Sequence, residues 1–126
     1  MDFVQTDLAP RAVGPYSQAT RIGGWLHLSG QIALDPESGA LVSGGVDVQI
    51  HQVMKNIGAV LKAVGAGYGE LVKTTLYLID LEDFAAVNEI YGQYVRIPYP
   101  ARSTLGVTAL PKGALVAVDG VAWLGK

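Results

Sequence analysis

The sequence predicts a single α+β domain, residues 1–126, in which two helices pack on one face of a mixed β-sheet. Between residues 46 and 64 apolar side chains recur at steps of three and four, which is typical of a helix with one buried face. Runs rich in β-branched and aromatic residues lie on both sides of this helix. The chain is half apolar, so a domain of this length can form a core.

The first half of the chain contains two strands and the long helix. Residues 1–16 read as extended or looping chain with prolines at Pro10 and Pro15. Residues 17–22 and 25–33 then flank Gly23-Gly24, a pair suited to a tight hairpin turn. A second turn covers residues 35–39. The helix over residues 46–64 is expected to stop at Gly65, because glycine commonly follows a helix end.

The second half predicts a strand, a helix and two further strands. Residues 70–79 form the strand, and Asp80 and Asp83 suit a helix start. Pro98 and Pro100 end that helix. Residues 101–109 and 114–124 read as long strands joined by the turn 110–113. We expect an antiparallel pair at each end of the chain and an apolar second sheet face that a partner must cover.

Composition narrows the classes of function. Charged residues make up 16%, below the usual figure of about 25%, which favours burial against a partner subunit. The net charge is −2 and the basic residues are scattered, which argues against nucleic acid as a main partner. No cysteine is present, so disulfides and thiolate sites are excluded. Neither a secretory signal nor an apolar run of ~18 residues occurs, so we expect no membrane partner and a cytoplasmic protein.

Arg102 is the first candidate for a binding residue, because it opens a strand in apolar surroundings. A guanidinium remains charged and presents a rigid fork that fits a carboxylate with two hydrogen bonds. The alternative is a structural ion pair with one of the eleven acidic residues. The sequence leaves both interpretations open.

Three other segments carry similar alternatives. Ser29-Gly30 interrupts an apolar strand, where a ligand could approach the backbone or where a β-bulge could form. Tyr16 follows a Gly-Pro turn and could meet a ligand or pack on the rim of the core. Asn88 on the second helix could reach a ligand or face solvent. His27 and His51 are not spaced as a ligand pair, so we expect no metal site.

Four segments together resemble the reactive intermediate deaminase (Rid, YjgF) family. They are GPYSQA (14–19), LHLSGQIA (26–33), VKTTLYLIDLEDFAAVNEIY (72–91) and PARSTLGVTALPKGALVAVDGVA (100–122). The resemblance covers nearly the whole chain. It implies a chorismate-mutase-like fold and a homotrimer in which three sheets form an inner barrel with clefts at the subunit boundaries.

The resemblance also implies an activity that needs no cofactor, the hydrolysis of 2-imino acids to 2-keto acids and ammonia. In that pattern Arg102 binds the substrate carboxylate, and the backbone carbonyl of Thr104 helps to hold the water. The cleft would be lined by Tyr16, Ser29, Gly30 and Asn88.

One position departs from the family pattern. Typical family deaminases read Glu-x-Glu on the last strand, and the first Glu helps to position and polarise the attacking water. Here Ala117 takes the place of that first Glu and Asp119 that of the second. Two strand steps separate these positions by ~6.5–7 Å. A positioned general base is typically worth ~10²–10⁴ in rate, so its loss could leave binding without fast turnover.

The leading hypothesis is therefore a 2-iminobutanoate/2-iminopropanoate deaminase, with Arg102 holding the acid. The alternative is a non-catalytic or weakly catalytic trimer that binds a small 2-keto or 2-imino acid, which Ala117 motivates. A ribonuclease or translation inhibitor is a third class attached to some family members. The sequence supports it least, because it has no basic stripe and no histidine pair.

Overall fold

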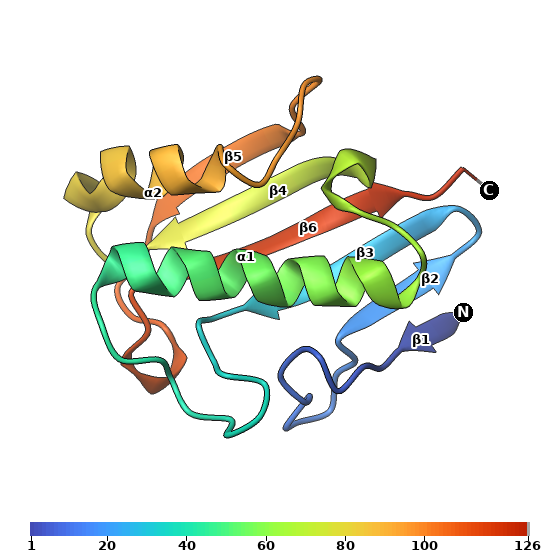
Figure 1. Ribbon diagram of the computed structural model, residues 1–126, viewed down its shortest axis with the longest axis horizontal. Helices are drawn as coiled ribbons and strands as arrows, with labels where there is room; N and C mark the ends of the chain where they lie inside the picture. Colours follow the sequence, from blue (N-terminus) through green and yellow to red (C-terminus); the bar gives the residue numbers. More distant parts are fainter. Residues whose placement is uncertain (126) are drawn as a thin grey trace.

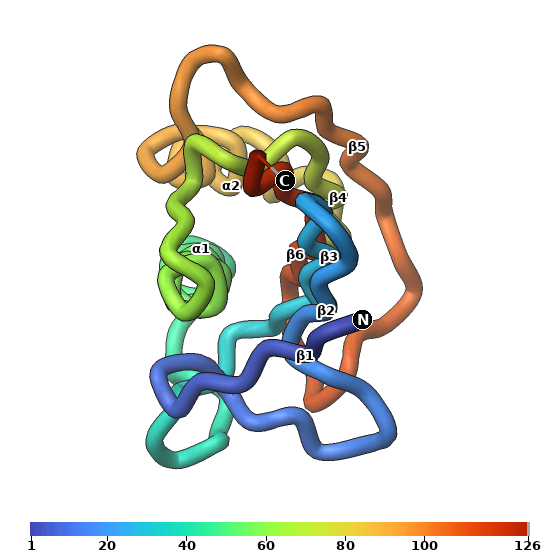
Figure 2. The backbone as a smooth tube through the Cα atoms, turned by 90° about the vertical axis from the view of Figure 1, so that its right-hand side faces the viewer, coloured from blue at the N-terminus to red at the C-terminus, as the bar shows by residue number. Residues whose placement is uncertain are grey.

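The computed structural model describes residues 1–125 as one mixed sheet with two helices on one face (Figures 1 and 2). The strands lie in the order β1-β2-β3-β6-β4-β5. The α+β class predicted from the sequence is confirmed. The elements are β1 (Asp2–Val4), β2 (Ala19–Ile22), β3 (Trp25–Gln31), α1 (Val46–Ala63), β4 (Leu71–Leu78), α2 (Phe84–Tyr91), β5 (Ala101–Gly106) and β6 (Val116–Trp123).

The first two predicted strands form the expected antiparallel hairpin, β2 and β3. Gly23 in the turn has a φ of 58°, a left-handed conformation that glycine adopts without steric cost. The short strand β1, within the segment read as extended or looping, pairs antiparallel with β2. The strands of this half of the sheet therefore agree closely with those predicted from the sequence.

The prediction that the last two strands pair with each other is wrong. β6 lies between β3 and β4 and is antiparallel to both, whereas β5 pairs in parallel with β4 at the sheet edge. The difference follows burial: Val116 and Val118 of β6 are fully buried, while residues of β5 are half-buried or exposed. The parallel pair requires a crossover, which α2 provides.

The long helix α1 supplies most of the helical side of the core. Its residues Ile50, Val53, Val60 and Leu61 are completely buried against the sheet, as their spacing predicts. The helix ends at Ala63, and Gly65 follows with a φ of 75°. No helix formed within residues 1–125 has the length and apolar character needed to cross a bilayer.

The sheet face opposite the helices is mixed, which corrects the expectation of an apolar face. Trp25 and Trp123 contact each other there, with ring centroids 4.7 Å apart and ring planes tilted by 56°, and both are more than two-fifths exposed. Polar residues of β4, however, alternate with residues that face the helices. Tyr77 is one of them, and its hydroxyl donates a hydrogen bond to Asp119.

Candidate active site

Arg102 lies at the second position of β5, where α2 passes over it. Its Nη1 donates a hydrogen bond to Oδ1 of Asn88 at 2.8 Å. The guanidinium carbon also lies 5.2 Å from the ring centroid of Tyr91 and 5.5 Å from that of Phe84. Within residues 1–125 the hydrogen-bond partner of this cation is thus an uncharged amide, and the ion-pair interpretation is not what the structure shows.

A pocket of about 470 Å³ opens beside this guanidinium, and we call it the Arg102 pocket. Its floor includes Tyr91, whose hydroxyl shares a 2.7 Å hydrogen bond with the buried Thr74. Burial raises the pKa of Tyr91 above its ordinary value, so the ring stays a neutral phenol. The pocket is lined by Asn88, Tyr91, Gly92, Val95, Tyr99, Pro100 and Arg102.

Asn88 is exposed on α2, and the sequence could not decide whether it faces a ligand or solvent. Its amide oxygen instead accepts the hydrogen bond from Arg102. Three chemical features therefore converge on the guanidinium: one amide, two aromatic faces and an open pocket. Such an arrangement orients the planar fork and leaves its remaining N–H donors available to an anion.

A second pocket, of about 380 Å³, contains other predicted residues, and we call it the Tyr16 pocket. Tyr16 is 51% exposed, so it lies at the surface and is not packed against the rim of the core. The lining residues are Pro10, Arg11, Val13, Tyr16, Gln18, Gly30, Gln31, Ile32, Leu34, Tyr77, Leu110, Pro111, Lys112, Ala117 and Asp119.

The Ser29-Gly30 segment forms the β-bulge that was one of its two interpretations. The register between β3 and β6 shifts between Leu28 and Gln31. Ser29 Oγ donates to the carbonyl of Ser17, which ties the bulge to the preceding segment. Gly30 faces the Tyr16 pocket, and a Cβ added there would meet no atom within 4 Å. The bulge thus holds bare backbone at the pocket wall.

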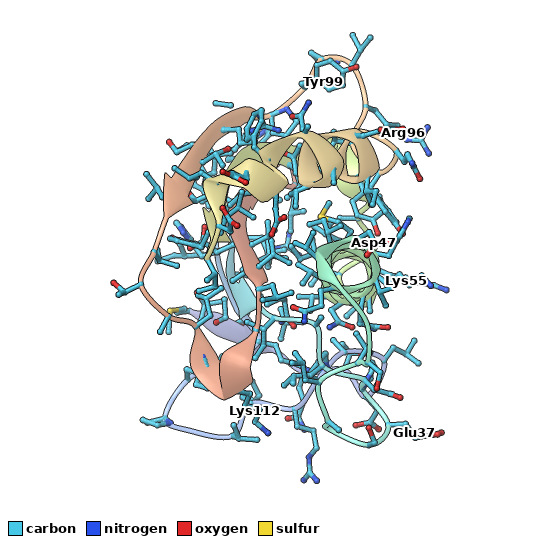
Figure 3. All side chains as sticks on the ribbon, turned by 90° about the vertical axis from the view of Figure 1, so that its left-hand side faces the viewer. Glu37, Asp47, Lys55, Arg96, Tyr99 and Lys112 are labelled. Atoms are coloured by element: carbon cyan, nitrogen blue, oxygen red, sulfur yellow. The ribbon has the colours of Figure 1, made fainter. Side chains whose placement is uncertain are left out.

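The structure does not bring all the predicted residues together within one chain. Arg102 and Asn88 lie in one pocket, and Tyr16 and Gly30 in the other. Figure 3 places Tyr99, of the Arg102 pocket, and Lys112, of the Tyr16 pocket, at opposite ends of the molecule. Neither Ser29 nor Thr104 is among the residues that line these two pockets. Thr104 sits on β5 opposite Leu76.

Tyr77 and Lys112 are among the residues of the Tyr16 pocket that the sequence did not single out. Tyr77 donates from its hydroxyl to Asp119 Oδ2 at 2.9 Å, and this hydrogen bond raises the pKa of Tyr77. Lys112 has a φ of 59° in the turn before β6, a rare conformation for a residue with a side chain. The strand alternation Lys73, Thr75, Tyr77 was the one signal for Tyr77, because it predicts a single shared face.

The two histidines lie apart from both pockets. His51 Nδ1 shares a 2.8 Å hydrogen bond with the hydroxyl of Tyr94, and His27 is exposed on β3. Over residues 1–125 no three His, Asp or Glu side chains gather in a group that could hold a metal ion.

Comparison with known proteins finds a family model and curated relatives that match nearly the whole chain. The family model described as Endoribonuclease L-PSP matches residues 6–124. A 2-iminobutanoate/2-iminopropanoate deaminase of Homo sapiens is 49% identical over 119 residues, which cover 94% of this chain and 87% of the human protein.

Solved structures agree in fold over nearly the whole chain. RidA from an Antarctic Psychrobacter is 41% identical with a TM-score of 0.94, covering 98% of this chain and 99% of that one. Escherichia coli TdcF with bound serine is 33% identical with a TM-score of 0.92, covering 98% of both chains. The chain therefore belongs to the reactive intermediate deaminase (Rid, YjgF) family.

Proposed function

We propose that this protein is a hydrolytic deaminase that converts small 2-imino acids, 2-iminobutanoate and 2-iminopropanoate among them, to 2-keto acids and ammonia. The observation that carries the proposal is the Arg102 guanidinium, oriented by Asn88 and two aromatic rings, with an open pocket beside it. The name of the human relative supports the same substrate class.

The reaction requires two things of the protein: a group that binds the substrate carboxylate, and a water molecule held near the C=N carbon. Arg102 would bind the carboxylate of the substrate through two parallel hydrogen bonds. That fixes the adjacent C=N carbon, which the carboxylate and protonation of the nitrogen make electron-poor. The water oxygen bonds to this carbon while the C=N π pair moves to nitrogen, and the water gives up one proton. After the nitrogen is protonated, the C–N bond breaks, ammonia leaves, and the hydroxyl loses its proton to become the keto oxygen.

We also propose that the complete site forms between subunits of a homotrimer. The Arg102 pocket of one subunit would face the Tyr16 pocket of the next, which would place Tyr16, Gly30 and Ser29 near an acid held by Arg102. The distance between the two pockets in one chain supports this arrangement, as does the edge position of β5. The exposed Trp25 and Trp123 add apolar area for subunits to cover.

A second function is a small-acid-binding trimer without turnover. Ala117 favours it, because a methyl group lines the Tyr16 pocket where the family pattern has the water-positioning Glu. Such a protein would bind 2-ketobutyrate through Arg102 and would leave the rate of imine hydrolysis unchanged.

The test generates 2-iminopropanoate in situ from alanine with an amino-acid oxidase and adds semicarbazide, which competes with water for the imine. An active deaminase lowers the initial rate of semicarbazone formation, because semicarbazide reacts faster with the imine than with the keto acid, and Arg102→Ala abolishes that effect. Arg102→Lys is the matched control, since it keeps the charge but not the fork, and we expect it to retain only part of the activity. Calorimetric binding of 2-ketobutyrate with no effect on the initial rate of semicarbazone formation would select the binding protein instead.

A further inference from the structure

The Tyr16 pocket has an acidic residue of its own. Among its lining residues, all within the described part of the chain, Asp119 is the one that carries a carboxylate. Asp119 Oδ2 accepts the hydrogen bond from the Tyr77 hydroxyl at 2.9 Å, which leaves Oδ1 outside this contact. A carboxylate held on one oxygen and open on the other can accept a proton from a water molecule.

The strand register explains how this carboxylate relates to Ala117. In the β4–β6 pair, Tyr77 lies opposite Ala117, and Thr75 lies opposite Asp119. The hydrogen bond from Tyr77 to Asp119 therefore runs diagonally across one sheet face, between the level of residue 117 and that of residue 119. Asp119 need not reach back to position 117, because the pocket extends along the face to both residues.

We infer that Asp119 is the base that takes the proton of the attacking water, with Tyr77 as the positioning residue that holds it. The inference rests on the proposed deaminase function and on the Tyr16 pocket lying near the substrate. As the water oxygen bonds to the imine carbon, one water proton passes to Asp119 Oδ1. Asp119 returns that proton to the amino nitrogen. A lone pair of the hydroxyl oxygen then forms the C=O bond as the C–N bond breaks, ammonia leaves, and the hydroxyl proton passes to solvent water. The carboxylate is restored, so no other reactant is consumed.

Further polar side chains line the same pocket as Asp119 and Tyr77. Arg11 and Lys112 line the same pocket, so two cations share the space with the single carboxylate. Tyr16 adds a second phenol beside Tyr77.

The experiment compares kcat and KM for 2-iminopropanoate in wild type, Asp119→Asn, Tyr77→Phe and the control Glu37→Gln, an exposed loop acid. We expect Asp119→Asn to lower kcat on the order of 10²-fold with little change in KM, which is the usual range for a lost general base. Tyr77→Phe should lower kcat about tenfold, as expected for one hydrogen bond to a charged group. Unchanged binding of 2-ketobutyrate in each variant shows that the pocket is intact.

A rescue variant separates chemistry from structure. Ala117→Glu added to Asp119→Asn places a carboxylate at the neighbouring position and should restore most of the lost kcat. In the wild-type background the same substitution should change kcat only a few-fold, because Asp119 already acts. A wild-type kcat in Asp119→Asn would overturn the inference and leave the deaminase standing. Loss of imine hydrolysis in wild type itself would remove the proposed function, and this inference with it.

Discussion

The Arg102 guanidinium and the Asn88 amide oxygen are joined by a 2.8 Å hydrogen bond that links β5 to α2. The acceptor is neutral, so the bond orients the cation without cancelling its charge. A neutral acceptor leaves the guanidinium fork available to an anion, whereas a carboxylate at the same distance would occupy the fork permanently.

Replacing Asn88 by Asp should make that distinction measurable. The substitution preserves the shape of the side chain but places a carboxylate against the guanidinium. That carboxylate would then compete with the substrate carboxylate for Arg102. We expect KM for the imine to rise about tenfold to a hundredfold, or 1.4–2.8 kcal/mol as roughly 1.4 kcal/mol for each factor of ten. Glu89→Gln, at the exposed neighbouring position, is the control and should leave KM unchanged. An unaltered KM in Asn88→Asp would mean that the substrate does not use this guanidinium.

Mixing two inactive variants should test whether the site forms between subunits. Arg102→Ala disables one pocket, and Gly30→Leu blocks the other, since a Cβ at Gly30 points into open space. If each site takes one pocket from each of two neighbours, random reassembly regenerates about a quarter of the sites in wild-type form. The measurement is imine hydrolysis after unfolding and refolding the variants together. Refolding each alone gives the baseline, and a mixture that stays at that baseline would place both pockets of a site on one chain.

Tyr68 should make stability depend on pH in the alkaline range. Its hydroxyl donates to the carbonyl of Met54 at 2.7 Å, and burial raises its pKa from 10.0 to about 12. The folded state thus holds the phenol proton more tightly than the unfolded state. This contribution is complete below pH 10 and is lost as the pH rises through about 12.

The measurement is the urea midpoint of wild type and Tyr68→Phe across that range. The difference between the two proteins should shrink as the pH rises, because only wild type loses a protonated phenol. Tyr99→Phe is the control, since Tyr99 is 64% exposed. A difference that stays constant through pH 12 would contradict the raised pKa.

The local sequence pattern predicted most of the helices and strands of the fold. What it did not predict was which strands pair with each other in the second half of the sheet. The spacing of apolar residues located α1 to within one residue, because a buried helical face constrains every third or fourth position. The pairing of β5 with β4 was missed because a short turn between two strands also suits a hairpin. Which strand lies in the middle of a sheet depends on how much of its apolar surface is buried in the folded chain. The complete burial of Val116 and Val118 in β6 is seen only in the structure.

Some of the candidate site residues could be predicted from the sequence, and others could be found only in the structure. Arg102 stood out in the sequence because a charged residue in an apolar strand needs a partner, and its neutral partner Asn88 appears only in three dimensions. The separation of Tyr16 from Arg102 could not be predicted, since the resemblance names residues without assigning them to subunits. Tyr77 was missed because its chemistry depends on Asp119, 42 residues away in the chain.

The edge position of β5 has a consequence for the isolated chain. The strand bonds to β4 on one side, and within residues 1–125 its other side has no neighbouring strand. Unpaired backbone groups in a row are a template for another strand, including the first rung of a fibril. The strand that carries Arg102 is thus one of the two edges of the sheet that a partner could cover. In the proposed homotrimer, dilution that separates the subunits would open the substrate site and expose this strand edge to aggregation.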